Sequence, residues 1–371
     1  MSNPKVDMKG FLVIDNSAYG VPSGGIRFAQ NITLFEMVRL SRAMTLKFCT
    51  FGIPAGGAKS GLIGDPLDRN RDLLITSFAL SLAPFIKEKI YYPGPDMGTC
   101  DSDLERIFKI IGNPELTPRK IGLMKDDIPI EELFTGYGVV NCLKSVLQYK
   151  KTKNNKPKII LEGFGKVGTS IALYLRESNY KLTGVSTIKG AIYDDEGLNI
   201  DQLLRLKNEF GGDELVNHYE SKNVIKILKE KLFELSADYP TDVIIPGARP
   251  DVINKDNVDK IKAKWIIPAA NIPYQKGVID ILEEKGIVCF PDFVSNAGEI
   301  LAIAVINNPI GEAEIFNYIK TKISEKTLEI LNGANEQKIP PFHFAENEAL
   351  NALRKKITKI KRKIERINKK F

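Results

Sequence analysis

The stretch that most constrains the fold is KIILEGFGKVGTSIALYL at residues 158–175. Its apolar start, its glycines in the spacing G-x-G-x-x-G and its amphipathic end predict a strand, a tight turn and a helix. In that order Gly163 permits the turn, Gly165 lets backbone N–H groups approach a pyrophosphate, and Gly168 lets the helix contact the strand closely. The turn therefore predicts a dinucleotide-binding fold. The residues expected to hold the dinucleotide are Gly163, Phe164, Gly165, Lys166, Val167 and Gly168.

Three later runs are apolar at nearly every position: DVIIPGA at 242–248, WIIPAAN at 265–271 and IVCFPDF at 287–293. Such runs are typical of parallel strands that helices cover on both faces. We therefore predict a Rossmann-type, doubly wound α/β domain over residues 135–304. Ala248, at the end of the first run, is expected beside the dinucleotide.

The second strand of this domain ends in LTGVSTIKG, which contains Ser186, Thr187 and Lys189 but no acid. An acid at this point would accept the ribose 2′-OH of NAD and repel the 2′-phosphate of NADP. Because Thr187 and Lys189 stand there instead, we predict that NADP is at least tolerated.

The rest of the chain is predicted to form a second α/β domain from residues 1–134, completed by C-terminal helices at 305–371. A length of 371 residues suits two domains. The expected elements are a strand at 10–15, a helix at 33–44 capped by Thr33 and Glu36, a strand at 47–53, a helix at about 71–88, and a helix capped by Ser102 and Glu105 that buries Leu104, Ile107, Phe108 and Ile111.

Composition argues against several classes of protein. The first residues contain no apolar run of signal-peptide length, and no stretch reaches the roughly 20 apolar residues that a bilayer span needs. We therefore expect no membrane partner. The four cysteines form no CxxC pair and the chain has only two histidines, so we predict reduced thiols, a cytoplasmic location and no metal site.

The net charge of +7 comes from the C-terminal end. Residues 354–371 hold ten Lys/Arg and one acid, whereas the preceding 353 residues hold 43 basic and 45 acidic groups. We expect a helix here whose apolar stripe docks on the body of the protein or on a sister subunit, and no nucleic-acid partner. The stripe repeats at heptad spacing and consists of Leu350, Leu353, Ile357, Ile360, Ile364 and Ile367.

A second glycine-rich stretch, FGIPAGGAKSGLIGDP at residues 51–66, surrounds Lys59. Lys47 lies twelve residues earlier, and Asp96 follows in GPDMGT. A lysine crowded by another cation can lose its proton near neutral pH and serve as a base or donor at a carbonyl carbon. The second lysine can hold a carboxylate, and the aspartate can relay protons. We expect the glycines to clear space for a ligand beside Lys59.

These residues resemble the glutamate, leucine, phenylalanine and valine dehydrogenase family. The motifs GGIRF, MTLK, IPAGGAKSGLIGDP, GPDMGT, TGYGV, GFGKVG, ANIP and SNAG occur in the family's order over about residues 10–305. The resemblance implies an N-terminal substrate and oligomerisation domain, NAD or NADP as cofactor, and a homo-oligomer. The implied reaction is oxidative deamination of an L-amino acid to a 2-oxo acid and ammonia.

The resemblance also implies roles for single residues. Lys47 would bind the substrate α-carboxylate, Lys59 would polarise the carbonyl and activate the attacking water, and Asp96 would pass protons to and from the amino nitrogen. Around the nicotinamide and the substrate the resemblance places Thr135, Asn271, Asn296, Gly24 and Gly25.

Two departures from the family pattern concern the substrate. Glutamate-specific members resemble one another in a lysine that holds the γ-carboxylate and in a serine beyond the N-A-G-G motif, but this chain has Ser23 and Ile303 there. Losing a cation and a hydroxyl favours an apolar substrate side chain such as that of leucine or valine, since an unpaired buried charge is costly. Glutamate stays open, because GPDMGT resembles the glutamate branch and because Arg27 or Lys125 could replace the missing lysine.

Two alternative functions stay open. A hydroxy-acid dehydrogenase would pair a catalytic histidine with an acid, but His218 and His343 lie outside the glycine-rich motifs. A non-catalytic cofactor-binding or regulatory protein would use the basic C-terminal helix for binding. Such a protein has no need of Lys47, Lys59 and Asp96, and all three are present.

Overall fold

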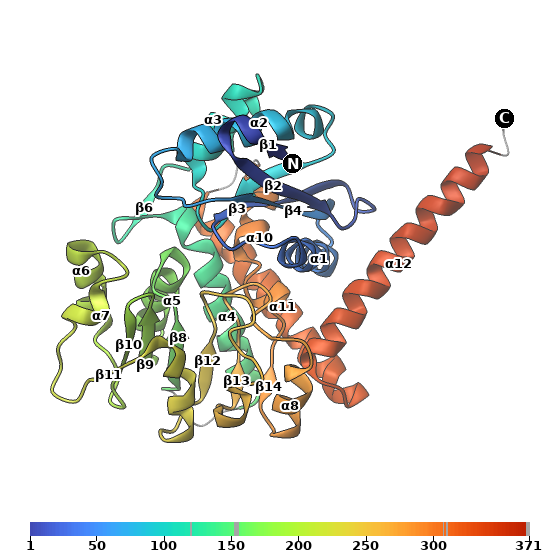
Figure 1. The fold of residues 1–371 in the computed structure, drawn as a ribbon. Helices are drawn as coiled ribbons and strands as arrows, with labels where there is room; N and C mark the ends of the chain where they lie inside the picture. Colours follow the sequence, from blue (N-terminus) through green and yellow to red (C-terminus); the bar gives the residue numbers. More distant parts are fainter. Residues whose placement is uncertain (119–120, 152–155, 307, 309–310, 369–371) are drawn as a thin grey trace. The chain divides into compact units, whose positions relative to one another are not determined.

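The computed structural model describes residues 1–118, 121–151, 156–306, 308 and 311–368. The chain divides into two compact units: unit 1 comprises residues 1–119 and 346–371, and unit 2 comprises residues 120–345. Each unit is α/β, and each has its own large sheet (Figure 1). The sequence analysis assigned residues 120–134 and 305–345 to the first domain, whereas the structure groups them with unit 2.

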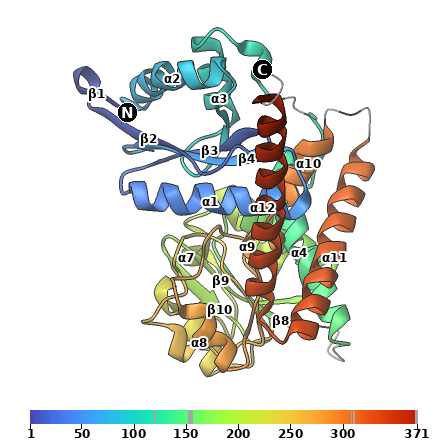
Figure 2. The same ribbon diagram turned by 90° about the vertical axis from the view of Figure 1, so that its right-hand side faces the viewer.

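Unit 1 contains a five-stranded mixed sheet in the order β1-β2-β4-β3-β5. The neighbours of β4 are β2, which is antiparallel to it, and β3, which is parallel. Figure 2 shows α1 on one face of this sheet and α2 and α3 on the other. The elements are β1 (Ser2–Asn3), β2 (Met8–Ile14), β3 (Val21–Ala29), α1 (Leu34–Phe51), β4 (Ala55–Ile63), α2 (Arg71–Lys87), β5 (Tyr92–Pro95) and α3 (Asp101–Ile110), with short 3-10 helices at Pro4–Val6 and Pro114–Leu116.

Helix α1 is longer than predicted, and the predicted strand at 47–53 is wrong because most of that segment is the end of this helix. Residues 47–49 are all buried, whereas a half-buried strand would bury alternate residues. A run this short does not distinguish strand from helix by its pattern alone. The start is as predicted, since Thr33 Oγ1 accepts the Glu36 N–H at 3.1 Å. Gly52, in the left-handed region at φ 65°, ends the helix.

Helix α3 begins earlier than predicted. The Cys100 N–H donates to Asp103 Oδ2 at 2.8 Å, so Cys100 and Asp103 cap the helix and the predicted cap by Ser102 and Glu105 is wrong. The shift leaves the predicted apolar face intact, because that face depends on helical spacing and not on the first residue. Its members Leu104, Ile107, Phe108 and Ile111 are buried in the core of unit 1.

Unit 2 contains a seven-stranded sheet in the order β11-β10-β9-β8-β12-β13-β14. Strands β8, β9, β12, β13 and β14 are parallel, which confirms the predicted Rossmann-type sheet. At one edge β10 pairs antiparallel with β9, and β11 pairs antiparallel with β10. The strands are β8 (Lys158–Glu162), β9 (Lys181–Thr187), β10 (Gly190–Tyr193), β11 (Ile225–Ile227), β12 (Val243–Ile245), β13 (Trp265–Ile266) and β14 (Val288–Cys289), and β6 (Met124–Lys125) and β7 (Ile128–Pro129) form a separate hairpin.

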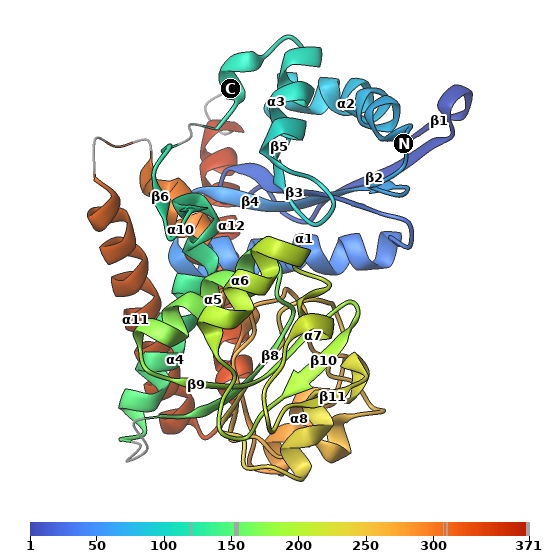
Figure 3. The same cartoon turned by 90° about the vertical axis from the view of Figure 1, so that its left-hand side faces the viewer.

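The helices of unit 2 cover both faces of this sheet. Figures 2 and 3 show α4 and α11 on one side and α8 on the other. The helices are α4 (Phe134–Tyr149), α5 (Lys166–Glu177), α6 (Ile200–Phe210), α7 (Leu215–His218), α8 (Val278–Glu284), α9 (Asp292–Ser295), α10 (Gly298–Ile306) and α11 (Glu312–Gln337), with 3-10 helices at Ile130–Glu132, Lys229–Lys231, Phe233–Ala237 and Val258–Lys260.

The last helix, α12 (Pro341–Asn368), carries the predicted heptad stripe. Leu353 is buried, in agreement with a docked stripe. Ile360, Ile364 and Ile367 are 37%, 51% and 47% exposed, so the second half of the stripe is not covered within the single chain.

The described residues contain no helix that combines the length and apolar character of a membrane span. Within the same residues, no group of three or more His, Cys, Asp and Glu side chains is arranged to hold a metal ion. All four cysteines are free thiols.

Candidate active site

Unit 1 holds the lysine and the aspartate that the sequence analysis singled out, and their side chains are in contact. Lys59 lies on β4 and is 3% exposed, and Asp96 directly follows β5. The Lys59 Nζ lies 2.8 Å from Asp96 Oδ2. Two strands that are not neighbours in the sheet, because β3 lies between them, thus bring these opposite charges together in a place largely shielded from water.

Arg27, on β3 between these two strands, extends the pair into a chain of charges. Its Nε donates to the same Asp96 Oδ2 at 2.9 Å, and its Nη1 pairs with Glu36 at the start of α1. Two cations and two anions therefore alternate, from Lys59 through Asp96 and Arg27 to Glu36. Sequence analysis missed this structural role of Arg27.

The position of Asp96 sets its protonation. Burial alone raises the pKa of the Asp96 carboxyl, but the charges and hydrogen bonds of Lys59 and Arg27 outweigh burial and hold that pKa well below its usual range. Burial lowers the pKa of Arg27, and its two carboxylate partners reverse the effect, so the pKa of Arg27 is raised. The Asp96 N–H also donates to Thr99 Oγ1 at 2.9 Å, which fixes the loop after β5.

The glycines of unit 1 have a packing function that the sequence analysis did not foresee. A Cβ atom on Gly24 would lie 1.7 Å from the Ala58 carbonyl oxygen on β4, and one on Gly25 would lie 2.6 Å from a backbone oxygen of β5. On Gly57, a Cβ would lie 2.4 Å from a backbone oxygen of α1. These glycines therefore let β3 and α1 approach their neighbours closely. The places where their side chains would lie are occupied by backbone atoms of unit 1.

The other two substrate residues predicted in unit 1 occupy different environments. Lys47 lies on α1 and is 5% exposed. Ser23 is half-buried on β3, opposite Gly57 of β4 in the strand register. The structure thus shows contact between Lys59 and Asp96, and places Lys47 and Ser23 in the same unit.

In unit 2 the glycine turn has the geometry that the sequence predicts. Gly163 adopts φ +90°, and its N–H donates to the Ser186 carbonyl oxygen at 3.1 Å. A Cβ on Gly168 would lie 2.0 Å from the Gly163 oxygen, so the third glycine permits the close contact of α5 with the turn. A Cβ on Gly165 would have no atom within 4 Å. Gly165 therefore stands at an open place at the N-terminus of α5, where backbone N–H groups suit a pyrophosphate.

An acidic segment lies at the end of β9, although the sequence places none there. Thr187 Oγ1 donates to the Asp213 carbonyl oxygen at 2.7 Å, and Lys189 Nζ lies 3.1 Å from Glu214 Oε1. The preceding Gly212 lies beside the Phe164 carbonyl oxygen, 3.3 Å from its ideal Cβ position. The segment after α6 thus folds back onto the turn. Asp213 and Glu214 lie far from Lys189 in the sequence, and the sequence pattern around Lys189 therefore did not reveal them.

Lys207 is a second cation near the turn that sequence analysis missed. Its Nζ donates to Thr169 Oγ1 at 2.7 Å, and that hydroxyl donates to the Gly165 carbonyl oxygen at 2.8 Å. Burial lowers the pKa of Lys207 and outweighs the opposite effect of the Glu132 charge. No motif marks Lys207, because it reaches the turn from α6.

The predicted nicotinamide-end residues of unit 2 also come together. Asn296 Nδ2 donates to Asn271 Oδ1 at 3.0 Å and to the Ala269 carbonyl oxygen at 3.1 Å. A Cβ on Gly298 would lie 3.1 Å from the Thr135 Cα, which places Thr135 beside the SNAG segment. Asn296 is 4% exposed, and its Oδ1 is buried with no hydrogen-bond donor among the described residues. A buried acceptor of this kind suits an N–H donor from a ligand.

Ala248 and Ile303 are the remaining predicted site residues, and the first makes a backbone contact while the second has an exposed side chain. The Ala248 N–H donates to Glu162 Oε2 at 3.2 Å, which ties the end of β12 to the end of β8 beside Gly163. Burial raises the pKa of Glu162. Ile303, on α10, is 56% exposed.

The parallel sheet with its open glycine turn, and the second α/β unit with its buried lysine–aspartate pair, define a two-unit dinucleotide-binding protein. The chain belongs to the glutamate/leucine/phenylalanine/valine dehydrogenase family. The sequence pattern of that family matches residues 128–361, and the pattern of its N-terminal part, described as a dimerisation domain, matches residues 3–112. The predicted family is thus confirmed.

Relatives of similar sequence carry glutamate dehydrogenase names. The NADP-specific glutamate dehydrogenase of Saccharolobus shibatae is 31% identical over 310 residues, which are 80% of this chain and 70% of the relative. The glutamate dehydrogenase of Aeropyrum pernix is 30% identical over 334 residues, covering 85% and 77%. The NAD-specific enzyme of Staphylococcus aureus is 29% identical over 307 residues, covering 78% and 70%.

Solved structures share the fold. The hetero-hexameric glutamate dehydrogenase of Thermus thermophilus, in a leucine-bound form, superposes with a TM-score of 0.81 at 21% identity, covering 94% of this chain and 84% of that one. The L-tryptophan dehydrogenase of Nostoc punctiforme gives a TM-score of 0.64 at 21% identity, covering 96% and 95%.

Replacing Asp96 tests the charge chain. We expect Asp96→Asn to destabilise unit 1 by about 3 kcal/mol at neutral pH, because two buried cations lose their partner. Since the folded-state pKa of Asp96 is lowered, its stabilisation is present above the ordinary aspartate pKa of about 4 and is lost as the pH falls below it. The stability difference between wild type and variant, measured by urea unfolding, should be constant from pH 8 to 5.

The matched control for this experiment is Asp7→Asn, because Asp7 forms an exposed pair with Lys9. It should change the free energy of unfolding little at any pH. A wild-type advantage over Asp96→Asn that already shrinks between pH 7 and 5 would contradict the lowered pKa of Asp96.

Two glycine variants test the dinucleotide turn. Gly165→Ala should fold with wild-type stability, since its methyl group meets no atom, and should weaken NADH and NADPH binding by at least about tenfold, since the methyl stands where the pyrophosphate approaches. Gly168→Ala should instead lower the stability itself. Fluorescence titration and urea unfolding separate the two effects, and unchanged cofactor affinity in Gly165→Ala would refute the assignment.

Proposed function

We propose that the protein catalyses the reversible NAD- or NADP-dependent oxidative deamination of an L-amino acid with an apolar side chain, giving the 2-oxo acid and ammonia. The observation that carries the proposal is the buried Lys59–Asp96 pair, 2.8 Å apart, in a chain of the amino-acid dehydrogenase family. The open turn at Gly165 and the unused acceptor of Asn296 support a nicotinamide dinucleotide as the second reactant.

Each residue of the proposed site has a role that follows from its charge. The bound nicotinamide supplies the acceptor for the hydride of the α-carbon. Lys47 would hold the α-carboxylate, and Lys59 would donate to the carbonyl oxygen and orient the water that attacks the imino carbon. Asp96, kept ionised by its two cations, would accept a hydrogen bond from the substrate amino group and pass protons to and from the amino nitrogen. Asn296 Oδ1 would accept from the carboxamide or the substrate.

The charges of the site argue for an apolar side chain on the substrate. Ser23 stands where a lysine would hold a second carboxylate. The two cations that could replace that lysine are engaged, since Arg27 pairs with Asp96 and Glu36, and Lys125 lies 2.8 Å from Glu177. A γ-carboxylate without a cation would lose its hydration without compensation.

Glutamate is the second candidate substrate. The observation that favours it is the identity of about 30% to proteins named as glutamate dehydrogenases. The relatives also divide between NADP-specific and NAD-specific enzymes. Because Glu214 neutralises Lys189, we propose that both cofactors are used and that neither is excluded by charge.

We further propose a homo-oligomer that works in a reducing compartment such as the cytoplasm. The match of residues 3–112 to a dimerisation domain and the fold shared with a hetero-hexameric glutamate dehydrogenase support subunit association. The exposed isoleucines of α12 offer additional surface for it. Four free thiols fit a reducing compartment.

A reductive amination assay tests the proposal. With ammonia and either NADH or NADPH, we expect turnover of 4-methyl-2-oxopentanoate and 3-methyl-2-oxobutanoate to exceed that of 2-oxoglutarate. Lys59→Ala should lower kcat by at least about a thousandfold, as loss of an acid–base group does, with cofactor affinity largely retained.

The matched control is Lys9→Ala, which removes an exposed lysine from the neighbouring strand β2 and should leave kcat unchanged. Normal turnover in Lys59→Ala would refute the role of that lysine. Activity with 2-oxoglutarate alone would refute the apolar specificity and leave the reaction class standing.

A further inference from the structure

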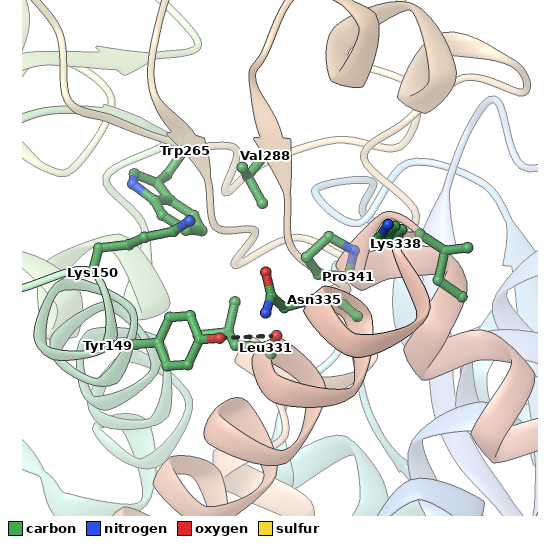
Figure 4. Close-up of a pocket in the computed structure, with 10 residues that line it drawn as sticks. Tyr149, Lys150, Trp265, Val288, Leu331, Asn335, Lys338 and Pro341 are labelled. Carbon is green, nitrogen blue, oxygen red and sulfur yellow. Dashed lines mark hydrogen bonds between the residues drawn. The ribbon is translucent and has the colours of Figure 1, made fainter.

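Unit 2 contains a pocket that the proposed reaction does not use (Figure 4). Its volume is about 260 Å³, and it lies between the ends of α4 and α11 and the first residues of β13 and β14. The glycine turn follows the last residue of β8, and these strands are parallel. The pocket therefore lies at the opposite edge of the sheet from the turn, and it is a separate site.

The wall of the pocket is apolar and includes the only tryptophan of the chain. Trp265, at the start of β13, is 5% exposed, and Leu331 and Ala334 of α11 are buried beside it. Val288 and Pro341 complete this wall. Liquid water would fill such a volume with about nine molecules, so the size of the pocket suits a small organic molecule and is too small for a nucleotide.

Two lysines stand at the rim. Lys150 Nζ lies 5.6 Å from the centroid of the Trp265 ring, and Lys338 is the residue that ends α11. Figure 4 shows the Lys150 amino group beside the tryptophan ring and the Asn335 amide directed into the pocket. The ten described residues that line the pocket include no carboxylate.

The charges of the pocket select the charge of its ligand. Both lysines lie at helix C-termini, and each such helix end contributes about −0.5 charge. Two ammonium groups and two helix ends together leave about +1, which a single anionic group balances. An inorganic ion would leave the apolar wall in contact with water, whereas a ligand with an apolar part would cover it. The wall therefore favours an anion that carries an apolar group.

We propose that this pocket binds a small apolar monocarboxylate, with the carboxylate between Lys150 and Lys338 and the apolar part against Trp265. The class includes the apolar 2-oxo acids of the proposed reaction, so the site would let such an acid bind the protein away from the catalytic residues. The Asn335 amide would donate to a carboxylate oxygen.

Phenylacetate is a suitable probe, because it combines one ring with one carboxylate. It should change the fluorescence of Trp265 saturably, and 2-phenylethanol, its uncharged counterpart, should bind at least about tenfold more weakly, since it lacks the charge-assisted hydrogen bonds. Inorganic phosphate should compete poorly. Equal binding of the alcohol, or no saturable change, would overturn the proposal.

Variants locate the site by calorimetry. Lys150→Gln and Lys338→Gln should each weaken phenylacetate binding by about fivefold, as expected for partly exposed ion pairs, and Ala334→Phe should abolish binding by filling the pocket. Lys144→Gln, which removes an exposed lysine from the same helix α4 outside the pocket, is the control and should have no effect.

Lys47→Ala separates this proposal from the proposed function, because Lys47 is the residue proposed to hold the substrate carboxylate. If phenylacetate bound only at the catalytic residues, Lys47→Ala would lower its affinity and the two pocket variants would not, and the pocket proposal would then be wrong. Unchanged affinity in Lys47→Ala together with loss in Lys150→Gln supports the second site whatever the enzyme's substrate.

Discussion

The ion pair between Lys59 and Asp96 is the interaction on which the rest of unit 1 depends. The buried charges of Lys59 and Arg27 are costly to remove from water, so both cations require the half-buried Asp96 as their partner. The close packing of β3, β4 and β5 brings the three side chains together. Glu36, from the start of α1, pairs with Arg27 and so balances the second positive charge, and this pair links the helix to the sheet.

The glycines around Lys59 follow from the same constraint. The neighbouring backbone occupies the places where their Cβ atoms would lie, at 1.7 Å for Gly24 and 2.4 Å for Gly57. A side chain at either position would push the strands apart or displace α1. The ion-pair distances among Lys59, Asp96 and Arg27 would then increase. In unit 2 the same residue type has two purposes. Gly168 permits internal packing, whereas Gly165 leaves space for a ligand.

Local sequence predicted those parts of the fold that local interactions determine. The strand–turn–helix around Gly163, the apolar parallel strands and the buried face of α3 needed only spacing and composition. The end of α1 could not be predicted, because the short run after Lys47 fits a strand as well as a helix until Gly52 ends it.

Contacts between distant segments escaped prediction for a different reason. Arg27 reaches Asp96 across 69 residues, Lys207 reaches Thr169 across 38, and Glu214 reaches Lys189 from the segment after α6. No motif records such pairs, because each depends on how the chain folds back. The family motifs identified the charged residues correctly as a group, but they gave no sign that Arg27 is a partner of the aspartate.

A double-mutant cycle on kcat for Lys59→Ala and Asp96→Asn tests the central claim that these two residues act as one catalytic unit, provided that both variants retain their fold and cofactor affinity. We predict that each single variant loses at least about a thousandfold and that the double variant is no more than about tenfold worse than either, as for residues that act together. Losses that multiply to about a millionfold, or near-normal turnover in either single variant, would contradict the account.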